Sequence, residues 1–396
     1  MTDIDAPDTH QITATARPRP YWSATKALWA AMESFGSPEG VRDEVDIRPA
    51  PWSLELYPTM ACSIACHFCY AQNRNEEYGF TSMPVEMMDR LHRSIESMGV
   101  RGVQYCGGGE PLQWRGGRIA DYIARLPRET TRAGMASNML RGRALARPDV
   151  LDRMVFLEVN VCGFDNASYA EVTGSSDGHE RMAAAVAEVL AARERHGLAT
   201  PVVNAKILIS NRNHQHLRAM YEWAESAGFD NIHLRLVDDY EKIGGFVLDS
   251  DQREEFRTEL VALARERGLT EWLDQAGLIL GEDNKGVRRD HRWCRTVANG
   301  LNCWVLSNGE VYVCGPQWGQ PQYLIGDLKE ADLEEIWGGP RHVEVAERLI
   351  RNMGLSRCYE MGCRHIKQTQ AIDAWRAGEV PMPQPQDFEQ RHAWFL

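Results

Sequence analysis

Between residues 52 and 240 the sequence alternates short strand-like runs with helical segments, and this alternation constrains the fold more than any other feature. Six runs have strand character: WSLELY, RGVQYC, AGMAS, VFLEVNV, PVVNAKILIS and NIHLRLV. Segments of strong helical character, such as PVEMMDRLHRSIESMG and ERMAAAVAEVLAARERHG, lie between several of them. Repeated strand–helix–strand units build parallel sheets, so the sequence predicts an α/β barrel or a doubly wound sheet.

The fourth, fifth and sixth strand-like runs distinguish between these two folds, because each of these runs has one apolar and one polar face. A parallel sheet covered by helices on both sides should be apolar on both faces. The apolar set is Val155, Leu157, Val159, Val161, Val203, Ala205, Ile207, Ile209, Ile232, Leu234 and Leu236. The polar set is Glu158, Asn160, Cys162, Asn204, Lys206, Ser210, His233 and Arg235. The pattern therefore favours a barrel whose lumen holds a polar ligand.

The composition is that of a folded, acidic protein. Hydrophobic residues make up 43% of the 396 residues, and the formal net charge is -12. This charge argues against a nucleic-acid binder and against binding to anionic membranes, because both need a positive surface. No apolar run approaches the roughly 18 residues of a membrane-spanning helix, and the first residues lack a signal-peptide pattern. We therefore expect a cytoplasmic protein, in which ten cysteines need a reason other than disulfides.

The sequence predicts five consecutive segments. They are an N-terminal tail with a short helix (1–50), the core barrel (51–245), connecting helices (246–285), a small second domain (286–375) and a C-terminal tail (376–396). The second domain contains a hairpin signal, CWVLSNGEVYVC, with Asn308-Gly309 at the turn. It also contains five of the ten cysteines, which suggests a second metal site.

Three cysteines stand directly after the first strand-like run, in the segment CSIACHFCY. Cys62, Cys66 and Cys69 have the spacing C-x3-C-x2-C. Three thiolates within eight residues can bind one face of an iron–sulfur cubane and leave one iron open to a substrate or cofactor. Zinc sites, the alternative, usually bring four protein ligands. The position after a barrel strand is where barrel enzymes place their chemistry.

This motif, with Tyr70 after its third cysteine, resembles the signature of the radical S-adenosylmethionine (SAM) superfamily. The resemblance covers roughly residues 50–240 and implies a partial (β/α)6 TIM-like barrel. It implies a 4Fe–4S cluster on the three cysteines that cleaves SAM to a 5′-deoxyadenosyl radical, and a reducing flavodoxin or ferredoxin as partner. The family's other SAM contacts correspond here to Gly108, Gly109 and Glu110 in the turn GGGEP, to Ser137, and to Asn160 and Lys206.

The C-terminal cysteines resemble the Twitch domain, a shorter relative of the SPASM domain, which binds an auxiliary 4Fe–4S cluster. Cys294, Gly309 and Cys314 fit C-x14-G-x4-C. The resemblance implies Cys294, Cys314, Cys358 and Cys363 as ligands. The last two are spaced more widely than the family's usual C-x2-C, so Cys303 is an alternative ligand. A structural zinc site is the other alternative.

The remaining cysteines bear on the reaction. The strand pattern directs Cys162 into the lumen, where a thiol could return a hydrogen atom to a substrate radical and invert its carbon; Cys303 and then Cys106 are the further candidates. The family resemblance implies an alcohol-bearing carbon of a sugar or aminocyclitol as the target, with epimerisation preferred. Dehydrogenation is the first alternative, with the auxiliary cluster as electron acceptor and a base among Asp238, Asp239 and Glu241. The other alternative functions are modification of a ribosomal peptide and non-enzymatic electron transfer by an iron–sulfur protein.

Overall fold

One mixed sheet organises the computed structural model, which describes residues 26–71, 79, 81–237, 239, 244–269, 293–352, 365–382 and 395. Its strand order is β6-β5-β4-β3-β2-β1-β7-β8-β9. The first six strands are parallel and follow the order of the chain. They are β1 (Ser53–Leu56), β2 (Gly102–Tyr105), β3 (Arg132–Ser137), β4 (Met154–Val161), β5 (Val202–Ile209) and β6 (Asn231–Leu236). The predicted α/β fold with six barrel strands is confirmed, and β6 and β9 form the edges of the sheet within the described residues.

The second domain continues the same sheet. Strand β7 (Asn302–Val305) pairs in parallel with β1, and β8 (Glu310–Tyr312) and β9 (Leu324–Asp327) follow as antiparallel strands. The predicted hairpin is confirmed: Gly309 has a φ of 97°, which a glycine adopts without strain. The parallel pairing of β7 with β1 was not predicted, and it brings the cysteine-rich domain directly beside the first barrel strand.

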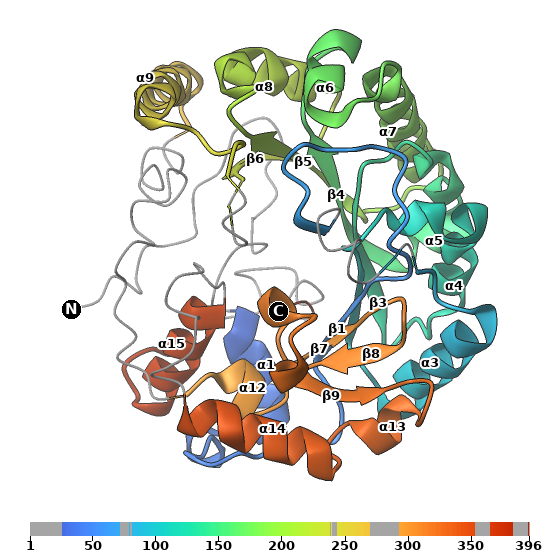
Figure 1. Cartoon of the computed structure of the whole chain (residues 1–396), viewed down its shortest axis with the longest axis vertical. Helices are drawn as coiled ribbons and strands as arrows, with labels where there is room; N and C mark the ends of the chain where they lie inside the picture. Colours follow the sequence, from blue (N-terminus) through green and yellow to red (C-terminus); the bar gives the residue numbers. More distant parts are fainter. Residues whose placement is uncertain are drawn as a thin grey trace.

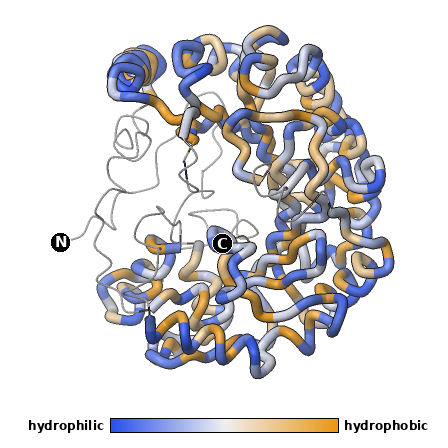
Figure 2. The backbone as a smooth tube through the Cα atoms, in the orientation of Figure 1, coloured by the Kyte–Doolittle hydropathy of each residue, from blue (hydrophilic) through white to orange (hydrophobic). Residues whose placement is uncertain are grey.

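Helices cover the outer face of the barrel strands, as the arc of ribbons in Figure 1 shows. These helices are α3 (Val85–Met98), α4 (Ile119–Arg125), α5 (Pro148–Leu151), α6 (Asn166–Thr173), α7 (Gly178–Arg195), α8 (Leu217–Ser226) and α9 (Ser250–Arg267). In Figure 2 they carry both hydrophilic and hydrophobic stretches, as amphipathic helices over a core should. Every helix in the described part of the chain is too short or too polar to span a bilayer.

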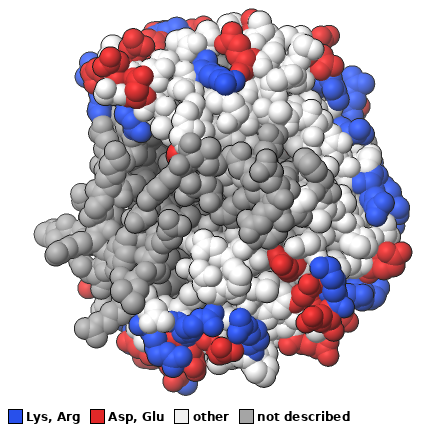
Figure 3. Space-filling view, in the orientation of Figure 1, with Lys and Arg blue, Asp and Glu red and all other residues white. Residues whose placement is uncertain are grey.

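The remaining helices belong to the lower part of Figure 1. They are α1 (Lys26–Phe35), α12 (Arg295–Ala298), α13 (Leu333–Ile336), α14 (Pro340–Arg351) and α15 (His365–Arg376). Helix α1 packs against α15 through a separate small core that includes Ala27, Ala31, Ile372 and Trp375. On the face shown in Figure 3, acidic and basic side chains are interspersed around the rim.

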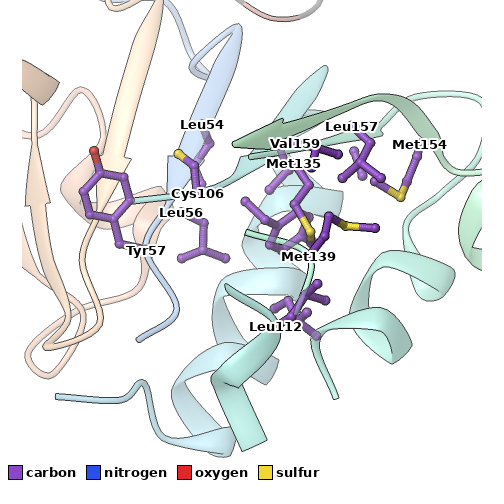
Figure 4. Close-up of a cluster of buried hydrophobic side chains, with 14 of the residues drawn as sticks. Leu54, Leu56, Tyr57, Cys106, Leu112, Met135, Met139, Met154, Leu157 and Val159 are labelled. Atoms are coloured by element: carbon purple, nitrogen blue, oxygen red, sulfur yellow. The ribbon is translucent and has the colours of Figure 1, made fainter. Parts of the chain in front are cut away.

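The main core lies between the sheet and the outer helices. It contains Leu54, Leu56, Met135, Leu157 and Val159, which Figure 4 shows in close contact. The apolar face predicted for β4 and β5 is confirmed for Leu157, Val159, Val203, Ala205, Ile207 and Ile209, all of which are fully buried. Burial of such side chains contributes roughly 1.5–3 kcal/mol each.

The prediction that Val155 shares this face is wrong. The pairing of β3 with β4 shifts between Ala133 and Gly134, which pair with Met154 and Phe156. This β-bulge adds one residue to β4 and changes the alternation of its side chains. Met154 therefore joins the main core, whereas Val155 packs with Phe156 and Phe395 in a separate cluster.

His342, which is fully buried, and His92, which is half-buried, should make the fold sensitive to acid. Burial lowers the pKa of His92 and of His342 to about 4, from the ordinary histidine value of about 6.5. As the pH falls, these histidines are protonated in the unfolded chain before they are protonated in the folded protein. The stability of the fold therefore decreases as the pH drops from about 6.5 to 4. Each histidine should lower the free energy of unfolding by about 2 kcal/mol when the pH falls from 7.5 to 5. Urea unfolding of His92→Gln and the wild type at both pH values tests this: an equal pH-dependent loss in the two proteins would contradict it.

Candidate active site

The three-cysteine loop leaves the end of β1 and is held by the end of α6. The backbone N–H of Ala65 donates to the carbonyl of Thr173 at 2.8 Å, and that of His67 donates to Val172 at 3.1 Å. The last carbonyls of a helix have no partner within the helix, so they are available to bind another segment. Helix α6 therefore fixes the loop on both sides of Cys66.

The glycine turn after β2 packs against the start of the same loop. The N–H of Gly109 donates to the Thr59 carbonyl, and that of Glu110 donates to the Ala61 carbonyl, both at 2.9 Å. A Cβ on Gly109 would lie 2.1 Å from the Ala61 oxygen, and one on Gly108 would lie 2.4 Å from the Met60 sulfur. Gly109 is required because backbone meets backbone there, and Gly108 because its φ of 63° favours glycine. The turn thus positions the residue that precedes Cys62.

The carboxylate of Glu110 is buried and bonded to the end of β3. It accepts hydrogen bonds from Ser137 Oγ at 2.8 Å, from the Asn138 N–H at 2.8 Å and from the Leu112 N–H at 3.1 Å. Burial raises the pKa of Glu110. The structure brings the predicted residues Gly108, Gly109, Glu110 and Ser137 together. Because both carboxylate oxygens already accept from the chain, we expect Glu110 to shape the turn, leaving cofactor contacts to the backbone.

The three thiols lie near one another. Desolvation raises the pKa of Cys62, and Glu110, Cys66 and Cys69 raise it further; the Cys62 sulfur accepts from Asn138 Nδ2 at 3.7 Å. The Cys66 thiol shares a hydrogen bond with the Cys162 thiol, which together with burial raises the pKa of Cys66. No three His, Cys, Asp or Glu side chains of the described ranges stand in ligating positions.

The chemistry of this donor set nevertheless fits an iron–sulfur cluster. None of the three cysteines is in a disulfide, and they belong to a single loop that two neighbouring segments hold by backbone hydrogen bonds. Thiolates are the ligands that such clusters use. Beside them is a tyrosine hydroxyl, that of Tyr169, which is buried and has no hydrogen-bond partner among the described residues. The sequence analysis missed this residue, because a tyrosine in a helix gives no local signal of what it faces.

Three polar side chains that are largely shielded from solvent form a row across β4, β5 and β6. Lys206 Nζ is 3.2 Å from Glu158 Oε2, and His233 Nε2 is 3.7 Å from Glu158 Oε1. Their side chains are only 5–15% exposed. Asn160 and Lys206, both predicted to contact SAM, are paired in register across β4 and β5. We name Glu158, Lys206 and His233 the lumen row. Its polar strand positions were predicted, but its pairing was not.

The three spare cysteines occupy different surroundings. Cys162 is 1% exposed and lies against Cys66. Cys303 on β7 is fully buried in the hydrophobic core, beside Leu54 of β1. The thiol of Cys106 lies 3.5 Å from Glu55 Oε2, and Lys206 and Glu158 are within electrostatic reach of it. Cys106 therefore lies within electrostatic reach of two members of the lumen row.

The second cysteine group is described in part. Cys294 precedes α12, and Cys314 precedes the short helical turn Gly315–Gln317; both are half-buried and neither is in a disulfide. Cys358 and Cys363 lie outside the described residues. The structure therefore describes two of the four predicted ligands. The auxiliary cluster itself remains a prediction.

Aromatic rings connect this domain with the three-cysteine loop. The ring centroid of Trp318, four residues after Cys314, lies 6.0 Å from that of Tyr70 and 6.1 Å from that of Tyr57. Burial raises the pKa of Tyr70, while hydrogen bonds with Trp318 and Tyr57 oppose this shift. The predicted residue Tyr70, next to Cys69, thus contacts the second domain.

Comparisons with known proteins agree with this architecture. The family description "Radical SAM superfamily" matches residues 56–224, and "Iron-sulfur cluster-binding domain", named SPASM, matches residues 294–364. The solved structure of anSMEcpe with bound AdoMet is 14% identical, with a TM-score of 0.53, and the match covers 74% of this chain and 82% of that chain. SuiB of Streptococcus suis, bound to precursor peptide SuiA, is 15% identical, with a TM-score of 0.53 and coverage of 85% and 73%. Identities this low show a shared fold alone. A search of the curated proteins gives no match.

Proposed function

Since this chain belongs to the radical SAM superfamily and carries a SPASM domain, we propose that it oxidises an alcohol-bearing carbon of a sugar-like or aminocyclitol-like molecule. Membership in the family implies SAM and a 4Fe–4S cluster in the barrel, and the SPASM domain implies auxiliary iron–sulfur clusters. Cys62, Cys66 and Cys69 would hold the first cluster. Cys294 and Cys314, together with Cys358 and Cys363, would hold an auxiliary cluster.

When bound, SAM and the barrel cluster supply the radical that removes a hydrogen atom, and the auxiliary cluster supplies an electron acceptor. The backbone of the turn from Gly107 to Glu110 borders the space beside Cys62 and would orient SAM there. Tyr70, Asn160 and Ser137 are the further candidates for contact with SAM, as the family resemblance implies.

The lumen row is the observation that carries the proposal. Buried charges are costly unless they are paired, so Glu158, Lys206 and His233 form a stable polar surface inside the barrel. Such a row can hold a substrate hydroxyl in place, and an imidazole or carboxylate can accept its proton as the carbon is oxidised. Asp239, an earlier candidate for this base, instead accepts a hydrogen bond from the Gly244 N–H at 2.7 Å in an exposed loop. Asp238 and Glu241 lie outside the described residues.

The positions of the cysteines favour oxidation over epimerisation. A thiol that inverts a carbon must reach the face opposite to hydrogen abstraction. Cys162 instead lies against the proposed ligand Cys66, and Cys303 lies in the hydrophobic core. Cys106 lies within electrostatic reach of Lys206 and Glu158, and it would be the donor if the enzyme epimerises. SuiB, which shares the fold, is bound to a peptide in its structure, so a peptide substrate is a competing outcome of the tests.

The enzyme class can be tested without a substrate. The anaerobically reconstituted, reduced protein should convert SAM to 5′-deoxyadenosine. Adding an aminocyclitol or hexose panel should increase this rate, whereas unrelated peptides should not. No cleavage under these conditions would favour an electron carrier, and stimulation by peptides alone would reject the small-molecule proposal. With an accepted substrate in deuterium oxide, a ketone without incorporated deuterium supports oxidation. Deuterium at an inverted carbon, lost in Cys106→Ala, would support epimerisation.

Replacing Lys206 by methionine should separate substrate binding from SAM cleavage. Loss of the pair with Glu158 should reduce substrate-stimulated turnover roughly 100-fold or more, since the row orients and deprotonates the hydroxyl. Basal formation of 5′-deoxyadenosine should remain. Arg193→Met is the matched control, because Arg193 pairs with Asp230 in another buried ion pair, beside the first residues of β5. Equal loss of basal cleavage in Lys206→Met would instead indicate that Lys206 binds SAM.

A further inference from the structure

The hydroxyl of Tyr169 is a buried polar group that lacks a hydrogen-bond partner within the described part of the chain. The residue lies on α6 and is 0% exposed. An unsatisfied buried hydroxyl costs about 1–3 kcal/mol, so such groups are rare and call for an explanation. A ligand that accepts this hydrogen bond would remove the cost.

The ring of Tyr169 is held firmly in place. A Cβ on Gly178 would lie 2.4 Å from its Cε1, and one on Gly163 would lie 2.3 Å from its backbone nitrogen. Helix α6 begins with a capping box formed by Asp165 and Ser168, and the Thr173 hydroxyl donates to the Tyr169 carbonyl at 2.7 Å. The hydroxyl is therefore aimed by close packing and by the helix itself.

The same helix holds the three-cysteine loop. The carbonyls of Val172 and Thr173, three and four residues after Tyr169, accept from His67 and Ala65. Tyr169 lies about one turn before these carbonyls on the same helix, within electrostatic reach of Cys62 and Cys66 of the loop. Burial raises the pKa of Tyr169, and nearby Cys162, Cys66, Glu110 and Cys62 raise it further. Among these neighbours, Glu110 already has three donors, which leaves the sulfurs as acceptors.

We propose that the Tyr169 hydroxyl donates a hydrogen bond to a sulfur of the iron–sulfur site at Cys62, Cys66 and Cys69, and thereby raises the reduction potential of that site. The inference rests on the proposed assignment of these cysteines as ligands. Hydrogen bonds to cluster sulfurs stabilise the more negative, reduced state and are a main determinant of cluster potentials. Tyr169 is in this view a positioning residue that sets the potential.

Tyr169→Phe removes only the hydroxyl and tests this role in the reconstituted protein. The matched control is Tyr122→Phe, in a side chain that is also buried and whose hydroxyl donates to Asp89 Oδ1 at 2.5 Å on the outer helices. The midpoint potential of each cluster is measured by redox titration with electron paramagnetic resonance. We expect the reduction equilibrium of the barrel cluster to fall about tenfold in Tyr169→Phe, which is about 59 mV for a one-electron couple. The auxiliary cluster should not change, and Tyr122→Phe should resemble the wild type.

An isosteric substitution keeps the test valid if Tyr169→Phe loses iron. Placing 3-fluorotyrosine at position 169 alone retains the ring and makes the hydroxyl a stronger donor, so the potential should rise. An unchanged potential in both variants, with full iron content, overturns the inference. If the variants bind SAM more weakly while the potential is unchanged, the inference is also overturned, because Tyr169 would then contact SAM instead of a cluster sulfur. Absence of iron from the loop in the wild type would instead reject the proposed function, so the two failures are distinguishable.

Discussion

Replacing Cys66 by alanine should remove the barrel cluster and with it all SAM cleavage. Two thiolates cannot hold a cubane that needs three, and Cys66 lies between the two backbone hydrogen bonds that fix the loop to α6. The loss of activity should exceed the roughly 100-fold that removal of an outer-shell partner causes. Iron analysis and assay of 5′-deoxyadenosine on the reconstituted protein measure both effects. The iron and the spectrum of the auxiliary cluster should remain.

The matched control for this prediction is Cys162→Ala. Cys162 contributes the other thiol of the hydrogen-bonded pair and is buried to the same degree as the core around it. We expect this variant to keep its iron and its SAM cleavage, because Cys162 is not one of the three proposed ligands. If both variants lose the barrel cluster, Cys162 is a fourth ligand. The open iron that SAM requires would then not exist, and the proposed mechanism would be wrong.

Features that depend on neighbouring residues could be predicted from the sequence. The polar alternation of β4 and β5, the hairpin at Gly309 and the glycine turn at Gly109 each follow from local periodicity or backbone sterics. The exception within this group is Val155, because the β-bulge beside it depends on pairing with β3. A one-residue shift of this kind changes which face a side chain occupies.

Features that depend on contacts distant in the sequence could not be predicted. The bond between Cys66 and Cys162, the pairing of Lys206 with Glu158 and the contact of Tyr70 with Trp318 each join different strands or domains. The unpartnered hydroxyl of Tyr169 is of the same kind, since its significance comes only from the loop that α6 holds. These contacts bear on the reaction, because they place Cys162 beside the proposed ligand Cys66.

Gly109→Ala should abolish cluster binding although it changes no candidate ligand. The added methyl group would lie 2.1 Å from the Ala61 oxygen and 2.5 Å from the Met60 carbonyl carbon, so one of the two backbone segments must move. That movement would break the hydrogen bonds from Gly109 to Thr59 and from Glu110 to Ala61 and displace Cys62. We expect a stability loss of about 1–3 kcal/mol together with loss of the iron at the three-cysteine loop.

Gly116→Ala separates this local effect from general destabilisation. Gly116 has a φ of 72° and no atom within 4 Å of the added methyl group, so alanine there is strained but touches nothing. The strain should cost about 1–2 kcal/mol, which is similar to the loss in Gly109→Ala. Urea unfolding should therefore give similar free energies of unfolding for the two variants. Iron analysis should show loss of iron only in Gly109→Ala. Full iron in Gly109→Ala would mean that the turn does not position Cys62, and equal iron loss in both variants would mean that the loop depends on stability alone.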